Sequence, residues 1–502
     1  MTAFYRAGFT PSRLVGLVVG LVVFALIIGL DSSLKHSADY GMRPAYAAAV
    51  TALMAIWWLT EALPIHWTAC LPLVLYPVLG VSGGGAGADL RDTALSYVDT
   101  YLFLYAGGMC VASAMQFWGL HRRIALSIMR QIGTDPRFLL LGILVATAFI
   151  SFWISNSATA TMMVSIGFAV IKQLESRVEG RRLGAYGMAI MLGVAYAANV
   201  GGIATKIGTA TNAQFSGLLS QMGIEVSFIQ FSLVGFPFVV LFLPVVWYAL
   251  WRLGRKDAPR EDLGKQAIDA EMHKLGPMSY AEKVVLTVFV SAAVLWIAGS
   301  PLTALLKASY PSVTITTARV ESSVAVLAAV ILMIWRIEGR AALGIDGLKL
   351  VPWSSLLLLG GSFAMAEGIR SSGLSIWMGQ QLTFVNAFDP FSQVMVISLA
   401  TVVLSAIASN VATVSVMFNI IRDAIASKFL LTALFASALA ASCDFALPAG
   451  TPPNAIVFGT GYVSLPQMVK TGVMLDIAAA ILVALWCWLI VPVVFDSILV
   501  NP

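Results

Sequence analysis

Charge is scarce in this sequence. Only 11% of its 502 residues are Asp, Glu, Lys or Arg, whereas 59% are hydrophobic. Soluble domains carry roughly 25% charged and about 45–50% apolar residues. Because so few charges cannot keep a folded chain in water, the composition excludes a soluble globular protein. It predicts an all-α polytopic membrane protein.

Residues that usually carry catalysis or bind metals are also few. The four histidines stand at no metal-ligand spacing, and no HExxH motif occurs. The four cysteines lie in apolar stretches without a CxxC pair, which is typical of buried hydrophobic residues. An intramembrane enzyme would need a nucleophile with a base, paired aspartates or a metal cluster. We therefore expect no enzyme and no cofactor beyond coupling ions.

Long apolar runs are abundant. Each can cross a bilayer at 1.5 Å per residue, with about 20 residues needed. The first run follows Arg6 and Arg13, but it exceeds a signal-peptide core and lacks a cleavage site, so it predicts a span. The eleven predicted spans are 14–30, 45–59, 67–82, 97–118, 185–220 (broken), 228–250, 284–300, 320–335, 351–371, 429–460 (broken) and 470–498.

Two further apolar stretches, 138–172 and 390–426, contain a polar kink in the middle. Each half is expected to be too short to cross comfortably, so both stretches predict re-entrant hairpins. Non-helical tips at membrane depth are tolerated only where they line a protein cavity.

The formal charge of +5 comes from Lys and Arg between apolar runs, which predicts loop charge and no nucleic-acid partner. Basic residues flank the first hairpin and fill the linker 252–283. We expect the protein in the plasma membrane. The positive-inside rule then places the N-terminus, the first hairpin and this linker in the cytoplasm. With eleven spans, the C-terminus lies outside.

An internal repeat is the most informative pattern. Gly107-Gly108, Ser151-x-x-x-Ser155-Asn156 and Gly208-Thr209-x-x-Asn212-Ala213 recur as Gly360-Gly361, Ser405-x-x-x-Ser409-Asn410 and Gly450-Thr451-x-x-Asn454-Ala455. Five spans separate the two hairpins, and an odd number of crossings inverts the second copy. The hairpins should enter from opposite sides, with tips that meet near the midplane.

The chemistry at these tips favours an anion. Asn156 and Asn410 each precede a half-helix, whose N-terminus carries about half a positive charge. The broken backbone at Gly208 and Gly450 exposes carbonyl oxygens, which suit hard monovalent cations. A cation there would neutralise a carboxylate that is otherwise costly to bring into the membrane. This combination predicts symport.

These motifs resemble those of the divalent anion/sodium symporter family, which carries di- and tricarboxylates. Ser155-Asn156-Ser157 and Ser409-Asn410-Val411 are similar to its paired Ser-Asn-Thr motifs, and Thr451-Pro452-Pro453-Asn454 to its second loop. The resemblance implies an elevator mechanism in a homodimer. It also implies sodium sites at Ser151, Ser155, Asn156 and Gly208, and at Ser405, Ala408, Asn410 and Gly450. Substrate would meet Asn156, Ser157, Thr209, Asn410, Val411, Thr451 and Pro452.

Four regions follow from this resemblance. Residues 1–130 would form scaffold helices and an interfacial helix, and 131–222 the first hairpin and broken helix of the transport domain. Residues 223–371 would be scaffold with the cytoplasmic linker, and 372–502 the second hairpin, broken helix and last helix.

Two departures from the family pattern stand out. Val411 removes a hydroxyl from one tip. Lys206 puts an ammonium at membrane depth, where it is costly unless paired or hydrated. It could pair with an acid, with Asp444 on the matched loop as the candidate, replace one sodium ion, or touch the substrate.

Three functions stay open at this point: a sodium-coupled di- or tricarboxylate carrier, a sodium-independent dicarboxylate exchanger, and another member of the wider ion-transporter fold. The last class includes oxyanion permeases and sodium/proton antiporters. Duplicated Ser-Asn tips favour a carboxylate, and the missing buried carboxylate pair argues against proton exchange.

Overall fold

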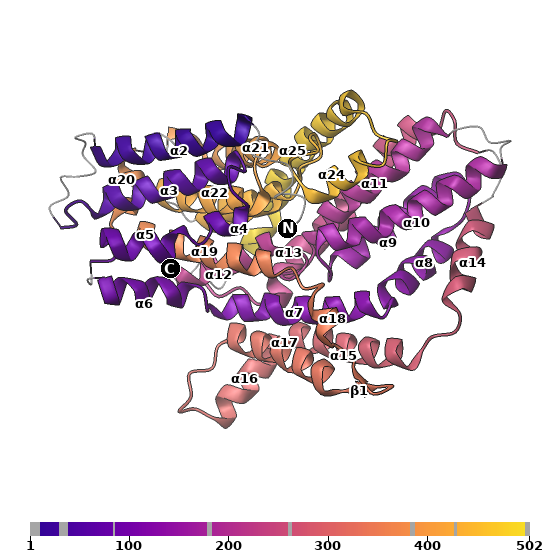
Figure 1. The fold of residues 1–502 in the computed structure, drawn as a ribbon, viewed down its shortest axis with the longest axis horizontal. Helices are drawn as coiled ribbons and strands as arrows, with labels where there is room; N and C mark the ends of the chain where they lie inside the picture. Colours follow the sequence, from indigo (N-terminus) through magenta and orange to yellow (C-terminus); the bar gives the residue numbers. More distant parts are fainter. Residues whose placement is uncertain are drawn as a thin grey trace.

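The computed structural model describes residues 11–29, 39–83, 86–177, 183–259, 264–381, 387–425 and 429–496. Helices make up most of these segments (Figure 1). The only strands within them, β1 (Arg336–Ile337) and β2 (Arg340–Ala341), pair antiparallel as a small ribbon.

The helices fall into two successive series that correspond to the two repeats and their connections. Up to the polar linker they are α2 (Pro11–Gly29), α3 (Arg43–Leu59), α4 (Ile65–Thr68), α5 (Leu71–Leu79), α6 (Ala86–Ser96), α7 (Thr100–Phe117), α8 (Leu120–Ile132), α9 (Pro136–Ser151), α10 (Asn156–Arg177), α11 (Gly184–Gly202), α12 (Ala210–Gln221), α13 (Phe228–Gly254) and α14 (Gly264–Leu275). After it they are α15 (Tyr280–Ile297), α16 (Gly299–Ser309), α17 (Thr317–Ile334), α18 (Ile345–Leu348), α19 (Trp353–Ser371), α20 (Leu374–Gln381), α21 (Pro390–Ile407), α22 (Asn410–Ala424), α23 (Leu430–Ala441), α24 (Pro452–Phe458) and α25 (Leu465–Val494).

Each of the eleven predicted spans contains a helix, and the predicted breaks in two of them are present. The first break separates α11 from α12, and the second separates α23 from α24. Pro452 stands in the first turn of α24, where a proline needs no backbone N–H partner. The predicted span at 67–82 begins within α4 and continues as α5, separated by a turn at Ala69 and Cys70.

Eight helices of the described chain are long and apolar enough to cross a membrane, and two of them belong to the hairpins. The expectation that each hairpin half is too short to cross is therefore wrong for α10 and α21. With 22 residues, α10 is about 33 Å long, because its helix continues beyond the apolar stretch into a polar segment that ends at Arg177. Composition marks the part that prefers lipid, whereas backbone hydrogen bonding sets the helix end.

The two hairpins lie in opposite parts of the molecule. Figure 1 shows α9 and α10 in the right half of the view and α21 and α22 in the left half. Helix α11 packs against α9, α10 and α13, and 89% of its most apolar 18 residues are buried inside the protein, against 33% for α25. A helix so enclosed carries its broken C-terminal end into the protein interior, where polar backbone groups need internal partners.

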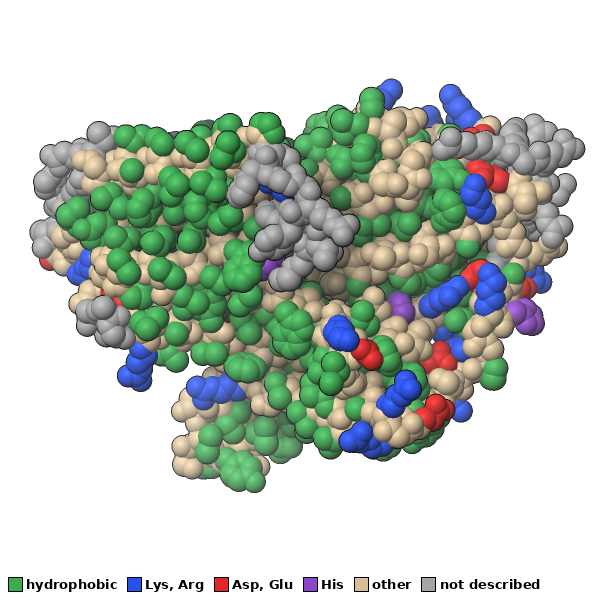
Figure 2. All heavy atoms as spheres, viewed as in Figure 1, with side chains coloured by type: hydrophobic (Ala, Val, Ile, Leu, Met, Phe, Trp, Pro, Cys, Tyr) green, Lys and Arg blue, Asp and Glu red, His purple; other side chains and the backbone are tan. Residues whose placement is uncertain are grey.

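The surface matches a membrane protein. Large hydrophobic side chains are exposed along the outer helices, for example Val240 on α13 and Leu489 on α25. Hydrophobic atoms cover much of the left part of the face in Figure 2, whereas most of its Lys, Arg, Asp and Glu lie to the right and along the lower edge.

The predicted polar linker contains α14, which packs on the amphipathic helix α8. Ion pairs join the two: Arg122 bonds Glu271, and Arg130 lies 3.3 Å from Asp269. Arg123 reaches the start of α15, with its Nε 2.6 Å from Glu282. This charged layer lies outside the apolar helices.

Candidate functional site

The tips of the two hairpins are built in the same way. In the first, Ser151 Oγ lies 2.9 Å from Asn156 Oδ1 and 2.7 Å from the carbonyl oxygen of Ala198. In the second, Ser405 Oγ lies 2.9 Å from Asn410 Oδ1 and 2.6 Å from the carbonyl oxygen of Ala441. Each serine has a single proton for two acceptor oxygens. Each tip is thus rich in oxygen lone pairs.

The two helix breaks also repeat each other. Asn212 Nδ2 donates to the carbonyl oxygens of Gly202 and Thr205, at 2.8 and 2.7 Å. Asn454 Nδ2 donates to those of Asp444 and Leu447, at 3.2 and 3.0 Å. These amides satisfy carbonyl groups that the broken helices leave unpaired. The internal repeat read from the sequence is therefore a structural repeat.

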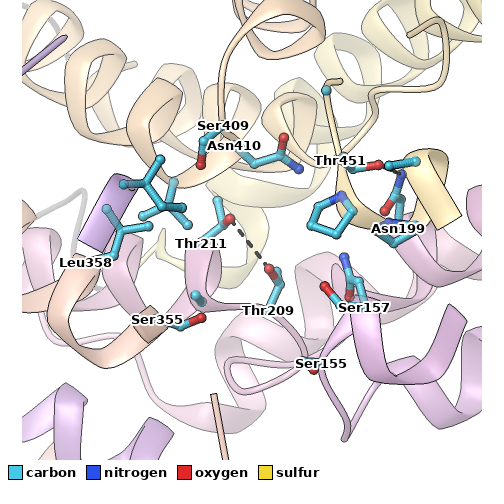
Figure 3. Close-up of a pocket in the computed structure, with 18 of the residues that line it drawn as sticks. Ser155, Ser157, Asn199, Thr209, Thr211, Ser355, Leu358, Ser409, Asn410 and Thr451 are labelled. Atoms are coloured by element: carbon cyan, nitrogen blue, oxygen red, sulfur yellow. Dashed lines mark hydrogen bonds between the residues drawn. The ribbon is translucent and has the colours of Figure 1, made fainter. Parts of the chain in front are cut away.

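Tips and breaks meet at one cavity of about 480 Å³ (Figure 3). In the figure Ser409, Asn410 and Thr451 lie along the upper edge, and Thr209, Ser157 and Ser155 lie along the lower edge. The residues that line the cavity come from both halves: Glu61, Ile65, Tyr105, Ser155, Asn156, Ser157, Asn199, Thr209, Ala210, Thr211, Ser355, Leu358, Ser409, Asn410, Val411, Pro448, Ala449, Gly450, Thr451, Pro452, Pro453 and Ala455.

Among the helices that begin at this cavity are α10 at Asn156, α12 at Ala210 and α22 at Asn410. Their first N–H groups have no partner within the helix and carry partial positive charge. Of the described lining residues only Glu61 is charged. Any positive potential in the cavity therefore comes from backbone dipoles and from ions that enter with a solute.

The predicted site residues divide into a lining layer and a layer behind it. Residues predicted to meet substrate all line the cavity: Asn156, Ser157, Thr209, Asn410, Val411, Thr451 and Pro452. Of the predicted sodium ligands, Ser155, Asn156, Asn410 and Gly450 also do so, whereas Ser151, Gly208, Ser405 and Ala408 do not. Ser151 and Ser405 are fully buried.

A family model of the sodium:sulfate symporter transmembrane region matches residues 12–495. The chain belongs to this family. It is a multi-pass membrane transporter and not an enzyme, and the family predicted from the sequence is confirmed.

Among the relatives of this symporter chain are sodium-dependent dicarboxylate transporters named SdcS. That of Staphylococcus saprophyticus is 33% identical over 506 residues, which cover 98% of this chain and 94% of the relative. That of Staphylococcus aureus strain USA300 is 34% identical over 510 residues, with the same coverage.

Two solved structures share the fold. The YdaH transporter of Alcanivorax borkumensis superimposes with a TM-score of 0.52 at 13% identity and covers 95% of this chain and 96% of its own. MtrF of Neisseria gonorrhoeae gives 0.53 at 12% identity, with 95% and 94% covered.

The predicted partner of Lys206 in this symporter was wrong. Lys206 Nζ lies 2.7 Å from Glu321 Oε2 on α17, and both side chains are fully buried. The ammonium also lies 4.9 Å from the centre of the Tyr101 ring on α7. Lys206 and Asp444 lie four positions apart on matched loops, and the lysine side chain leaves its loop toward α17.

Glu321 completes this buried cluster. Its Oε1 accepts from the backbone N–H of Phe228, at 2.5 Å, so both carboxylate oxygens are bonded. The sequence contained a signal that was overlooked, since an acid at the start of the apolar run 320–335 is expensive unless it is paired. Its partner could not be read from the chain, because 115 residues separate the two.

Asn199 was also missed. It lies on α11, and its Nδ2 is 3.0 Å from Thr451 Oγ1 and 3.2 Å from the carbonyl oxygen of Asp444. The amide thus links the first half to the loop of the second. Its position inside an apolar helix was the available signal.

Proposed function

We propose that the protein is a secondary active transporter that moves dicarboxylates across the membrane together with sodium ions, by an elevator mechanism. The proposal rests on one observation, a cavity enclosed by two inverted Ser-Asn tips and two broken helices. The names of the SdcS relatives, which are sodium-dependent dicarboxylate transporters, support the same substrate and ion.

The cavity suits a small dianion. Its polar wall offers the amides of Asn156 and Asn410 and the hydroxyls of Ser157, Thr209 and Thr451, which can donate to carboxylate oxygens. Val411 and Pro452 add apolar surface beside them. Helix N-termini on several sides would hold both ends of the anion.

The layer behind this wall suits monovalent cations. We assign one sodium ion to Ser151, Ser155, Asn156 and Gly208, and a second to Ser405, Ala408, Asn410 and Gly450. A cation beside Ser151 or Ser405 would satisfy the lone pairs that the single serine proton leaves unmatched. Cation and anion would then enter together, because each lowers the cost of bringing the other out of water.

The moving part would comprise the hairpins and broken helices of 131–222 and 372–502. The scaffold would comprise 1–130 and much of 223–371. Trp486 Nε1 on α25 donates to the carbonyl oxygen of Val234 at 2.8 Å, which supports counting α13 with the moving part. We further propose a homodimer in the plasma membrane, with the N-terminus in the cytoplasm and the C-terminus outside.

The sodium-independent exchanger is the second candidate, with Lys206 in place of a cation. The ion pair argues against it, because Glu321 already neutralises the ammonium. Lys206 also does not line the cavity in the described structure.

Uptake by purified protein in liposomes tests the proposal. Labelled succinate, citrate and sulfate would be offered with and without an inward sodium gradient, and with or without unlabelled substrate inside. We expect succinate uptake to require sodium and to need no internal substrate. Uptake that needs internal succinate and ignores sodium would favour the exchanger, and preference for sulfate would reject the dicarboxylate.

A further inference from the structure

The two loops that we assign to the cation sites differ by one ionisable residue. The spacing that relates Gly208 to Gly450 also relates Gly202 to Asp444. The asparagine bonds to the carbonyl oxygens of Gly202 and Asp444 show that the two positions are equivalent in space as well.

The first loop has no room for a side chain at this position. A Cβ atom on Gly202 would lie 2.4 Å from Asn156 Oδ1, closer than carbon and oxygen can approach. A Cβ atom on Gly208 would lie 2.5 Å from the carbonyl oxygen of Gly202 and 3.0 Å from that of Ser151. Neutral backbone oxygens therefore surround the space beside Gly208.

In the second loop a carboxylate occupies the equivalent space. Asp444 is fully buried, and its Oδ2 would lie 1.9 Å from a Cβ atom on Gly450. The absence of a side chain at Gly450 thus makes room for the Asp444 carboxylate. An ionisable oxygen lies where the first loop has carbonyl oxygens.

Asp444 has no partner for this carboxylate. Neither of its oxygens has a hydrogen bond within the described part of the chain. Lys206, the cation on the matched loop, is paired with Glu321. A buried carboxylate without donor or counter-ion is very costly, whereas one that coordinates a cation is stable.

Surrounding side chains hold the backbone at Asp444 in place. Asp476 Oδ1 on α25 accepts from the N–H of the next residue, Phe445, at 2.9 Å. Asn199 and Asn454 both bond the Asp444 carbonyl oxygen. Residues of both halves therefore fix the position from which the Asp444 side chain extends, as expected of an ion ligand.

We propose that Asp444 is a direct ligand of the second coupling cation, so that this site binds its ion through a carboxylate while the first site uses neutral oxygens alone. The inference rests on the proposed sodium coupling. A carboxylate ligand raises affinity for a small hard cation and compensates its charge within the protein. The second site should accordingly bind sodium tightly before any dicarboxylate is present.

Sodium binding without substrate tests this directly. Thermal unfolding of the purified transporter would be followed as choline is replaced by sodium, and bound ²²Na⁺ would be counted per chain. Asp444→Asn keeps the shape and removes the charge. We expect an apparent Kd for sodium at least about tenfold higher in this variant, and the loss of one substrate-independent ion per chain.

Asp476→Asn is the matched control. It removes an equal charge from a carboxylate that bonds the next residue, Phe445, and it keeps an oxygen acceptor for the Phe445 N–H. We expect it to shift the Kd less than about threefold. Equal shifts in both variants would overturn the ligand role in favour of a general field effect, and an unchanged Kd in Asp444→Asn would overturn it outright.

Asp444→Gly is the second variant, since it restores the residue that the first loop has, and it serves if Asp444→Asn does not fold. It should show the same loss of one ion. If the wild-type protein binds no sodium yet exchanges dicarboxylates, the inference fails together with sodium coupling. If it binds sodium at Asp444 but transports another anion, only the substrate assignment fails.

Discussion

The first and second halves of the transporter have similar backbone arrangements but differ in where their charged side chains lie. Ser151 and Ser405 make the same contacts at the two tips. Beside the tips, the first loop sends Lys206 outward to Glu321, whereas the second turns Asp444 inward toward Gly450. A duplicated backbone fixes where the oxygens lie, and single side chains then decide which half carries charge at the site.

The largest effect on transport should come from the residues that the halves share. Asn156→Ala and Asn410→Ala each remove a tip acceptor, a proposed ion ligand and a proposed substrate contact. Each of these three lost interactions is worth about 1 kcal/mol, so Vmax/KM of sodium-driven succinate uptake should fall about 100-fold in either variant.

Ser165→Ala is the control for these variants. Ser165 is exposed on α10 and bonds only the carbonyl oxygen of Thr161 among the described residues, so uptake should stay near the wild-type rate. Normal uptake by either asparagine variant would show that the two tips are not equivalent parts of one site.

The largest effect on stability should come from the ion pair that the second half lacks. Lys206→Met leaves Glu321 buried without its counter-charge, which should cost about 3–5 kcal/mol of stability. Thermal unfolding in detergent measures this loss, and the double variant Lys206→Met/Glu321→Gln should recover most of it.

Sodium dependence separates structural from coupling roles of Lys206. Where the double variant folds, we expect its sodium response to match the wild type, because the pair lies outside the proposed ion sites. A changed sodium stoichiometry would instead revive the hypothesis that the ammonium replaces a cation.

A smaller effect should distinguish the two loop glycines. Gly208→Ala meets backbone oxygens, whereas Gly450→Ala meets the Asp444 side chain. Each should cost about 1–3 kcal/mol through overpacking. Adding Asp444→Gly should relieve Gly450→Ala, and no side-chain change is available to relieve Gly208→Ala. Unfolding temperatures of the three variants test this, and failure of the relief would place the carboxylate elsewhere.

The smallest effect concerns the tips themselves. Val411→Thr restores a hydroxyl to the second tip, where one further hydrogen bond to a carboxylate is worth about 1 kcal/mol. We expect KM for succinate to fall about fivefold, measured as initial uptake at saturating sodium. Ser157→Val should raise KM by a similar factor, and a change in only one of the two variants would mean that the tips do not face the substrate symmetrically.

Much of the fold could be predicted because its signals are local or repeated. The spans follow from apolar runs, and the presence of Asn156 and Asn410 at one cavity follows from repeated motifs separated by an odd number of crossings. The length of α10 could not be read in the same way, since an apolar run does not mark where a helix stops.

Contacts between distant segments account for the remaining errors. The sequence shows that Lys206 needs a partner, but only the folded chain reveals that α17 supplies it. The alignment of the repeats put Lys206 and Asp444 on matched loops without indicating that their side chains point to different surroundings. Asn199 was overlooked for the same reason, because its partners lie more than 240 residues away.

The amide of Asn199 has a consequence for how the ions act on each other. It belongs to the first half and bonds Thr451 and the Asp444 carbonyl in the second. If the two loops bind ions as proposed, an ion that tightens one loop would also order the other, and the second ion to arrive would find its ligands already assembled. Occupancy should be cooperative, so that transport rises steeply with sodium concentration, with a Hill coefficient above one.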